Sequence, residues 1–280
     1  KLIFILWLFY SKVSKYLLWI KKLFLNNIEM KNKKIVWITG ASSGIGKELS
    51  YKFAQKGWKI ALTARRKDKL EKINKQTGNQ NLVCQADVSL KSDIKKAFKI
   101  LEKEYENIDL AILNAGMYSS VSINNFDSNV FQKHMEINYM GVINSLEQII
   151  PKMISQKSGH IAIITSPTGW RGLPKAAAYG PTKSALKNLA ESLRYELDAY
   201  GIKVQLFCPG FVSTEATPVG EHSLPGIITA EKAASLIYNS LSSKKFEVFI
   251  PNNTLIWSLY LLKFLPDSLA HRLIKWKTGY

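Results

Sequence analysis

From about residue 34 the chain alternates short β-rich runs with longer stretches of helical spacing, and this order constrains the fold most. Parallel strands need long crossover connections, so the alternation predicts a parallel sheet with helices on both faces. The runs with strand character are Ile35–Thr39, Lys59–Thr63, Leu82–Ala86, Leu110–Leu113, His160–Thr165, Lys203–Phe207 and Phe246–Ile250. Helical spacing marks Ser43–Lys56, Asp93–Tyr105 and Lys183–Tyr200. We therefore predict an α/β fold, a doubly wound parallel sheet in one domain over residues 30–251.

The composition excludes several classes of protein. The chain carries 39 Lys and Arg against 21 Asp and Glu, a formal net charge of +18. These charges are scattered along the sequence, which indicates a solvated exterior rather than a nucleic-acid surface. Cys84 and Cys208 end two strand-like runs, where small buried residues are expected. No disulfide framework and no metal site is predicted, and a reducing, cytoplasmic location fits.

Residues 1–29 form an apolar and basic extension. Leu2–Tyr10 is apolar but too short to span a bilayer, which needs about 20 residues. On a helix, Val13, Leu17, Ile20 and Phe24 would share one face and Lys12, Lys15, Lys22 and Asn26 the other. That pattern predicts a helix in a membrane interface. The alternative is upstream sequence without function, since Met30 stands just ahead of the first strand.

The last segment, residues 252–280, is amphipathic. Leu255–Leu265 is apolar apart from Lys263, and Pro266 follows it. This stretch is also too short to span a bilayer. Three roles stay open: dipping into the cytoplasmic face of a membrane, packing on a partner subunit in a homo-oligomer, or capping a substrate pocket.

A glycine-rich turn follows the first strand directly. The turn is Gly40-Ala41-Ser42-Ser43-Gly44-Ile45-Gly46, and a helical stretch begins within it. Glycines let the backbone approach a pyrophosphate, and the helix N-terminus supplies free N–H groups and partial positive charge. At this place in an alternating α/β chain, the turn predicts dinucleotide binding.

Three motifs together resemble a known family. Thr39-Gly40-x-x-x-Gly44-x-Gly46 is similar to the glycine motif of short-chain dehydrogenases/reductases. Asp87-Val88 resembles the family's adenine-contacting pair, and Asn114-Ala115-Gly116 its motif after the fourth strand. The resemblance covers about residues 33–250 and implies a Rossmann-like catalytic domain.

The end of the second strand predicts which nicotinamide cofactor binds. NAD enzymes place an acidic side chain there for the ribose 2′-OH, whereas a 2′-phosphate needs a basic one. Ala64 falls where the family's acidic residue would stand, and Arg65 and Arg66 follow. We therefore expect NADP(H) bound through Arg65, with NAD(H) as the alternative.

The pair Tyr179 and Lys183 is the strongest catalytic signal. A spacing of four residues places both side chains on one helix face. An ammonium nearby would lower the pKa of the phenol, making Tyr179 a usable acid or base. Pro181 lies between them, which a helix tolerates only in its first turn.

Two further polar residues complete the pattern. Ser166 ends a strand thirteen residues before Tyr179, the spacing seen in the family, and could polarise a substrate carbonyl. Asn138 matches the family's helix asparagine, which supports a water beside the lysine. The resemblance thus implies the catalytic tetrad Asn138, Ser166, Tyr179 and Lys183.

A last motif follows the sixth strand. Cys208-Pro209-Gly210-Phe211-Val212-Ser213-Thr214 resembles the family's Pro-Gly motif. By that resemblance, Pro209, Gly210, Val212 and Thr214 contact the cofactor. Glu215–Ile227, rich in Gly and Pro, is expected to form a substrate lid.

These features predict an NADP(H)-dependent oxidoreductase that transfers a hydride between nicotinamide and a carbonyl or secondary alcohol. An apolar small molecule is the expected substrate. A lipid-directed ketoreductase of the 3-ketosphinganine or acyl-chain type is an alternative, suggested by the apolar ends and by Trp170 and Leu173 near Ser166. A non-catalytic dinucleotide sensor is an alternative of another class, but such a protein typically lacks the Tyr/Lys pair.

Overall fold

A seven-stranded parallel sheet forms the centre of the protein. The structure is a computed structural model and describes residues 33–215, 217 and 224–280. The strand order is β3-β2-β1-β4-β5-β6-β9, and every neighbouring pair is parallel. The strands are β1 (Ile35–Thr39), β2 (Lys59–Ala64), β3 (Leu82–Gln85), β4 (Leu110–Leu113), β5 (Gly159–Ile164), β6 (Ile202–Pro209) and β9 (Glu247–Ile250). The predicted doubly wound sheet is confirmed.

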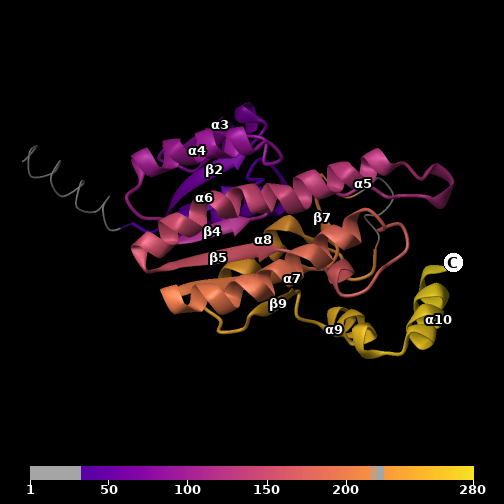
Figure 1. The fold of residues 1–280 in the computed structure, drawn as a ribbon. Helices are drawn as coiled ribbons and strands as arrows, with labels where there is room; N and C mark the ends of the chain where they lie inside the picture. The colour runs from indigo at the N-terminus through magenta and orange to yellow at the C-terminus, as the bar shows by residue number, and fades with distance from the viewer. Residues whose placement is uncertain (1–32, 216, 218–223) are drawn as a thin grey trace, which may run out of the picture. The chain divides into compact units, whose positions relative to one another are not determined.

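Helices cover both faces of this sheet. One face carries α4 (Lys91–Glu104), α6 (Gly141–Gln156) and α7 (Tyr179–Leu197), and the other carries α2 (Gly44–Gln55), α3 (Lys67–Gln76) and α8 (Ala230–Ser240). Figure 1 shows α6 and α7 in front of the strands and α8 behind them.

Side-chain alternation along the strands builds two separate cores. In β1, Trp37 packs toward α4, while Val36 and Ile38 pack toward α2. Successive side chains of a strand point to opposite faces, so a strand buried on both sides is apolar throughout. All five residues of β1 are buried, as this geometry requires.

The crossover from β1 to β2, and the later one from β4 to β5, run on opposite sides of the sheet. The strand order therefore reverses next to β1, where β1 lies between β2 and β4. Ligands of open α/β sheets bind beyond the carboxyl ends of the strands at such a reversal. The glycine turn after β1 and the residues after β4 meet at this point.

The C-terminal residues fold into two further helices, α9 (Thr254–Leu261) and α10 (Asp267–Thr278), drawn in yellow in Figure 1. Among the described residues, no helix is both long and apolar enough to cross a membrane. The predicted N-terminal interfacial helix, residues 1–29, lies outside the described residues.

Candidate active site

The glycine turn brings the backbone close to the end of β4. Gly40 and Gly44 have φ of +67° and +52°, in the left-handed region that favours glycine. A Cβ built on Gly40 would lie 2.8 Å from Ala115 Cα, and one on Gly46 would collide with Gly40 O. The glycines thus leave a bare backbone cradle at the N-terminus of α2, which suits a pyrophosphate.

Asn114 fastens this turn to β4. Its Nδ2 donates to Thr39 O at 3.1 Å and Gly40 O at 3.3 Å. The backbone N atoms of Asn114 and Ala115 both donate to Thr39 Oγ1. Asn114 therefore holds the cradle in shape, which explains why its amide is needed there.

The structure places Arg66, rather than Arg65, at the glycine turn. Arg66 donates to Ser42 Oγ from Nε at 3.3 Å and from Nη2 at 3.1 Å. The Arg65 side chain is 67% exposed, with Nη1 3.8 Å from Asp87 Oδ2. The predicted residue Arg65 thus lies beside Asp87, and Arg66 contacts the glycine turn.

Asp87 and Val88 are tied to their surroundings by backbone and side chain. Asp87 Oδ1 accepts from Ser89 N at 3.0 Å and Ser89 Oγ at 2.7 Å. Val88 O accepts from Asn144 Nδ2 of α6 at 2.9 Å. The pair is therefore held just after β3, with Val88 against α6.

Asn138 lies in a single π-helical turn, Met135–Met140, between α5 (Ser128–His134) and α6. Its Oδ1 accepts from Met117 N at 2.7 Å, and its Nδ2 donates to Met117 O at 3.0 Å and Thr182 Oγ1 at 3.2 Å. Such bulges recur at functional sites because they redirect a side chain. Here the bulge joins the chain after β4 to the start of α7.

Three side chains come together where β5 ends and the first turn of α7 begins: Ser166, Tyr179 and Lys183. Helix α7 begins at Tyr179 itself, so Pro181 is its third residue and lies within the first turn. Lys183 Nζ donates to Ile164 O at 3.0 Å and lies 5.4 Å from the centre of the Tyr179 ring. The Tyr118 ring packs edge-on against Tyr179 at 5.3 Å between centroids.

The pKa of Tyr179 shifts opposite to the direction expected from the sequence. Burial raises the pKa of this phenol from 10.0 to about 12. The interaction with Ser166 lowers the pKa in part, and Tyr118 raises it further. Burial also lowers the pKa of Lys183 from 10.5 to about 8. Desolvation penalises the charged form of each group, so it raises the pKa of the phenol and lowers that of the ammonium. The Tyr179 phenol is consequently protonated at neutral pH.

The Pro-Gly motif closes the other side of the site. Gly210 N donates to Ile250 O at 2.8 Å, and a Cβ on Gly210 would lie 2.5 Å from Ile256 Cδ1 of α9. Strand β7 (Val212–Ser213) then pairs with β8 (Ile228–Thr229). Thr214 lies against Gly44 of the glycine turn. Much of the predicted lid Glu215–Ile227 lies outside the described residues.

An aromatic cluster links α9 to the segment after Ser166. The Trp170 ring packs against Phe249 at 4.9 Å and Tyr260 at 5.1 Å between centroids. Trp170 Nε1 also donates to Glu247 Oε1 at 2.7 Å. Helix α9 is therefore packed against the segment that follows Ser166.

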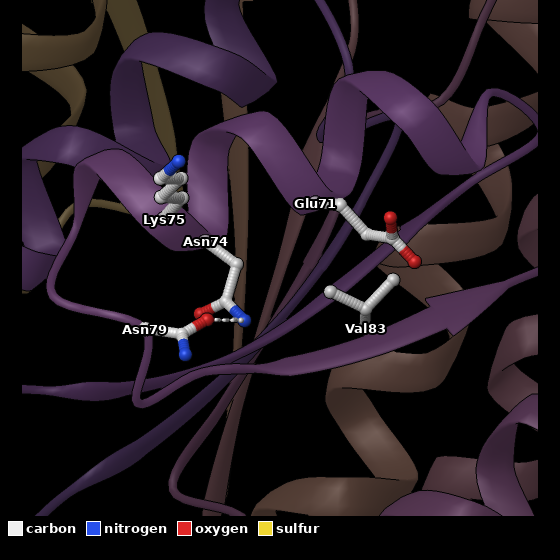
Figure 2. A pocket seen from close by; sticks show the side chains of 5 residues that line it. All are labelled: Glu71, Asn74, Lys75, Asn79 and Val83. Carbon is white, nitrogen blue, oxygen red and sulfur yellow. Dashed lines mark hydrogen bonds between the residues drawn. The ribbon is translucent and has the colours of Figure 1, made fainter.

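A surface depression of about 650 Å³ lies elsewhere. Figure 2 shows its lining residues, Glu71, Asn74, Lys75, Asn79 and Val83. They belong to α3, the loop after it and the first half of β3, away from the candidate catalytic residues Ser166, Tyr179 and Lys183. Asn74 Nδ2 donates to Asn79 Oδ1 at 3.2 Å, so the two amides bond each other. We assign no chemistry to it.

Sequence reasoning missed several residues that shape the site. Arg66, Thr182, Tyr118 and Asn144 make the contacts given above but were not singled out as site residues. Within the described part of the chain, no group of three or more His, Cys, Asp or Glu side chains could hold a metal ion. Both cysteines are free and buried.

Comparison with known proteins identifies the family. The profile of the family described as short chain dehydrogenase matches residues 34–222. An uncharacterized oxidoreductase of Listeria monocytogenes is 37% identical over 191 residues, covering 66% of this chain and 77% of the relative. The dehydrogenase/reductase SDR family member 7 of Homo sapiens is 30% identical over 254 residues, covering 83% of this chain and 74% of the relative.

A solved structure supports the same fold. A short-chain dehydrogenase from Streptomyces avermitilis superposes with a TM-score of 0.75 at 22% identity, covering 89% of this chain and 97% of that chain. The glycine cradle, the extent of the family match and the relatives agree with one another. The chain therefore belongs to the short-chain dehydrogenase/reductase family of oxidoreductases, whose members bind a nicotinamide dinucleotide.

Proposed function

We propose that the protein is an NADP(H)-dependent oxidoreductase acting on a carbonyl or secondary alcohol of an apolar small molecule. The proposal rests on one observation: Ser166, Tyr179 and Lys183 lie close together beside the glycine cradle. The Ser166 hydroxyl lies close enough to the Tyr179 phenol to lower its pKa, so one substrate oxygen could contact both hydroxyls. Such a constellation suits proton transfer to a developing alkoxide.

Each of these residues has a distinct part in the reaction. When bound, the nicotinamide ring supplies or accepts the hydride. Tyr179 donates its proton to the substrate oxygen, and Ser166 holds that oxygen by a hydrogen bond. The Lys183 cation stabilises the tyrosinate that remains, and Asn138 acts as a positioning residue through Met117 and Thr182. With its raised pKa, Tyr179 is protonated at neutral pH, which is the form that carbonyl reduction requires.

The residues after β2 support a preference for NADP(H). Ala64 offers no carboxylate to a ribose 2′-OH, and it is buried at the end of its strand. Arg66, bonded to Ser42 of the cradle, and Arg65 beside Asp87 provide guanidinium groups on both sides of this point. A guanidinium matches the geometry of a phosphate. NAD(H) remains the alternative cofactor.

Replacement of Tyr179 tests the catalytic proposal directly. Tyr179→Phe removes only the transferable proton and should lower kcat by about 10²-fold or more while the dinucleotide still binds. Tyr195→Phe is a matched control, because Tyr195 lies on the same helix and is 81% exposed. A Tyr179→Phe variant that keeps more than about a tenth of the wild-type kcat would contradict the assignment.

Apolar and aromatic groups around the site favour an apolar substrate. Tyr118 packs on the Tyr179 ring, Trp170 and Leu173 follow Ser166 in the sequence, and Tyr260 of α9 packs on Trp170. A lipid-directed ketoreductase of the 3-ketosphinganine or acyl-chain type is the second candidate on the same observation. A dinucleotide sensor fits less well, because it has no use for the Tyr179–Lys183 pair.

We also propose a peripheral contact with the cytoplasmic face of a membrane through α10. Leu269, Leu273 and Trp276 of α10 are exposed, and their spacings place them on one helix face. Arg272 and Lys277 flank this α10 stripe on its two sides. Basic residues beside an apolar stripe suit an anionic interface, whereas two copies of the stripe would bring like charges together.

A further inference from the structure

A carboxylate lies between two cations next to the glycine turn. Arg66 Nη1 is 2.7 Å from Glu215 Oε2, and Lys69 Nζ is 2.9 Å from Glu215 Oε1. The same Arg66 side chain donates from Nε and Nη2 to Ser42 Oγ. Arg66 and Lys69 therefore already hold one anion at the place where the end of β2 meets the cradle.

The backbone that presents this carboxylate crosses the glycine turn. Thr214, the residue before Glu215, lies so close that a Cβ built on Gly44 would be 3.1 Å from Thr214 Cγ2. Thr214 N donates to Thr217 Oγ1 at 3.0 Å, and Thr217 Oγ1 donates to Val212 O at 2.7 Å. Glu215 thus extends from an anchored stretch, and its pKa is lowered by hydrogen bonds from Lys69 and Arg66.

We propose that Glu215 is a specificity-determining residue: its carboxylate takes the position of the cofactor's 2′-phosphate, which must displace it from Arg66 and Lys69. The inference rests on the proposed preference for NADP(H). Carboxylate and phosphate oxygens accept the same charge-assisted hydrogen bonds from guanidinium and ammonium groups. NAD(H) carries a hydroxyl at this position, so it leaves Glu215 in place.

The exchange predicts a change of affinity that depends on the 2′-phosphate alone. Glu215 weakens binding of the 2′-phosphate, because its ion pairs with Arg66 and Lys69 must break first. All three side chains are partly exposed, at 41%, 38% and 55% for Arg66, Lys69 and Glu215. Exposed ion pairs are weak, so removing the carboxylate should tighten binding of the 2′-phosphate by about fivefold.

Calorimetric titration with 2′,5′-ADP and with 5′-AMP tests the exchange without turnover. These two ligands differ only in the 2′-phosphate. We expect Glu215→Gln to bind 2′,5′-ADP about fivefold more tightly than the wild type and 5′-AMP equally. Glu147→Gln is the matched control, because Glu147 forms an exposed ion pair with Lys91 at 2.7 Å outside the site. It should change neither affinity.

The other results are each decisive. Unchanged or weaker binding of 2′,5′-ADP by Glu215→Gln, with the wild type still preferring it to 5′-AMP, overturns the exchange and leaves the cofactor preference standing. Equal tightening of both ligands indicates a general charge effect and also overturns it. A wild type that binds the two ligands equally overturns the proposed NADP(H) preference itself.

Discussion

The side chain of Asn138 makes two hydrogen bonds with the backbone of Met117. Its Oδ1 accepts from Met117 N at 2.7 Å, and its Nδ2 donates to Met117 O at 3.0 Å. Both groups belong to the chain just after the Asn114-Ala115-Gly116 motif. Asn138 is fully buried, so no solvent can replace these bonds. The asparagine therefore fixes the distance between the end of β4 and the start of α7, where Thr182 accepts its third hydrogen bond.

Asn138→Asp should destabilise the protein. The aspartate keeps the acceptor for Met117 N but loses the donor to Met117 O and buries a charge. An unsatisfied buried partner costs about 1–3 kcal/mol, so we expect the free energy of unfolding to fall by about 2 kcal/mol or more. Urea denaturation measures it, with Asn188→Asp on the exposed side of α7 as control. Equal stability of the two variants would contradict the role given to Asn138.

The pH dependence of carbonyl reduction should report the titration of Lys183. Tyr179, with a pKa of about 12, stays protonated across the accessible range. Lys183, with a pKa lowered to about 8, loses its cation as the pH rises past that value. We therefore expect kcat/KM for reduction to be constant below about pH 7 and to fall above about pH 8.

A conservative variant separates this explanation from denaturation at high pH. Arginine stays protonated to above about pH 12, so any activity that Lys183→Arg retains should not decline near pH 8. The same decline in both enzymes, or none in the wild type up to about pH 10, would rule out Lys183 as the titrating group.

The two arginines after β2 should differ in their effect on cofactor binding. Arg66→Ala should weaken NADPH by roughly tenfold to a hundredfold, as expected for a charged hydrogen bond, and leave NADH nearly unchanged. Arg65→Ala should cost less, because the Arg65 side chain is 67% exposed. Fluorescence titration with each cofactor measures both. A larger loss from Arg65→Ala than from Arg66→Ala would favour Arg65, the residue expected from the sequence.

The sequence was sufficient for several features of the fold, and the structure adds that Arg66 is the arginine that contacts the glycine turn. The seven strands, the glycine turn and the family were predictable, since buried strands and glycine turns leave local patterns. Side-chain alternation did not show which arginine contacts the cradle. Leu62 and Ala64 of β2 face the α2 side, but β2 ends at Ala64, so the alternation does not extend to Arg66.

Other features of the site were not predictable from local patterns. The π-helical turn around Asn138 depends on contacts with Met117 and Thr182, which come from distant parts of the chain. The shift of the Tyr179 pKa depends on burial, which a spacing of four residues does not reveal. Packing of α9 against Trp170 likewise needs the fold, because the apolar sequence of α9 suits several partners.

The α10 stripe should bind anionic membranes in a salt-sensitive way. The segment 252–280 carries Lys263, Arg272, Lys275 and Lys277 against Asp267, and Trp276 is 72% exposed. Burying a Leu side chain contributes about 1.5–3 kcal/mol, and each basic residue near the surface about 1 kcal/mol. Flotation with phosphatidylserine vesicles should recover the full chain at low salt and less of it at high salt.

Leu273→Glu should reduce recovery by about tenfold or more, since the contribution of the buried Leu side chain is lost and a repelled charge is added. Tyr195→Glu places the same charge on an exposed aromatic position of α7 and should float like the wild type. A chain beginning at Met30 measures the share of residues 1–29 in the same assay. Should Leu273→Glu float as well as Tyr195→Glu, the α10 stripe is not the contact, and any remaining attachment belongs to another part of the chain.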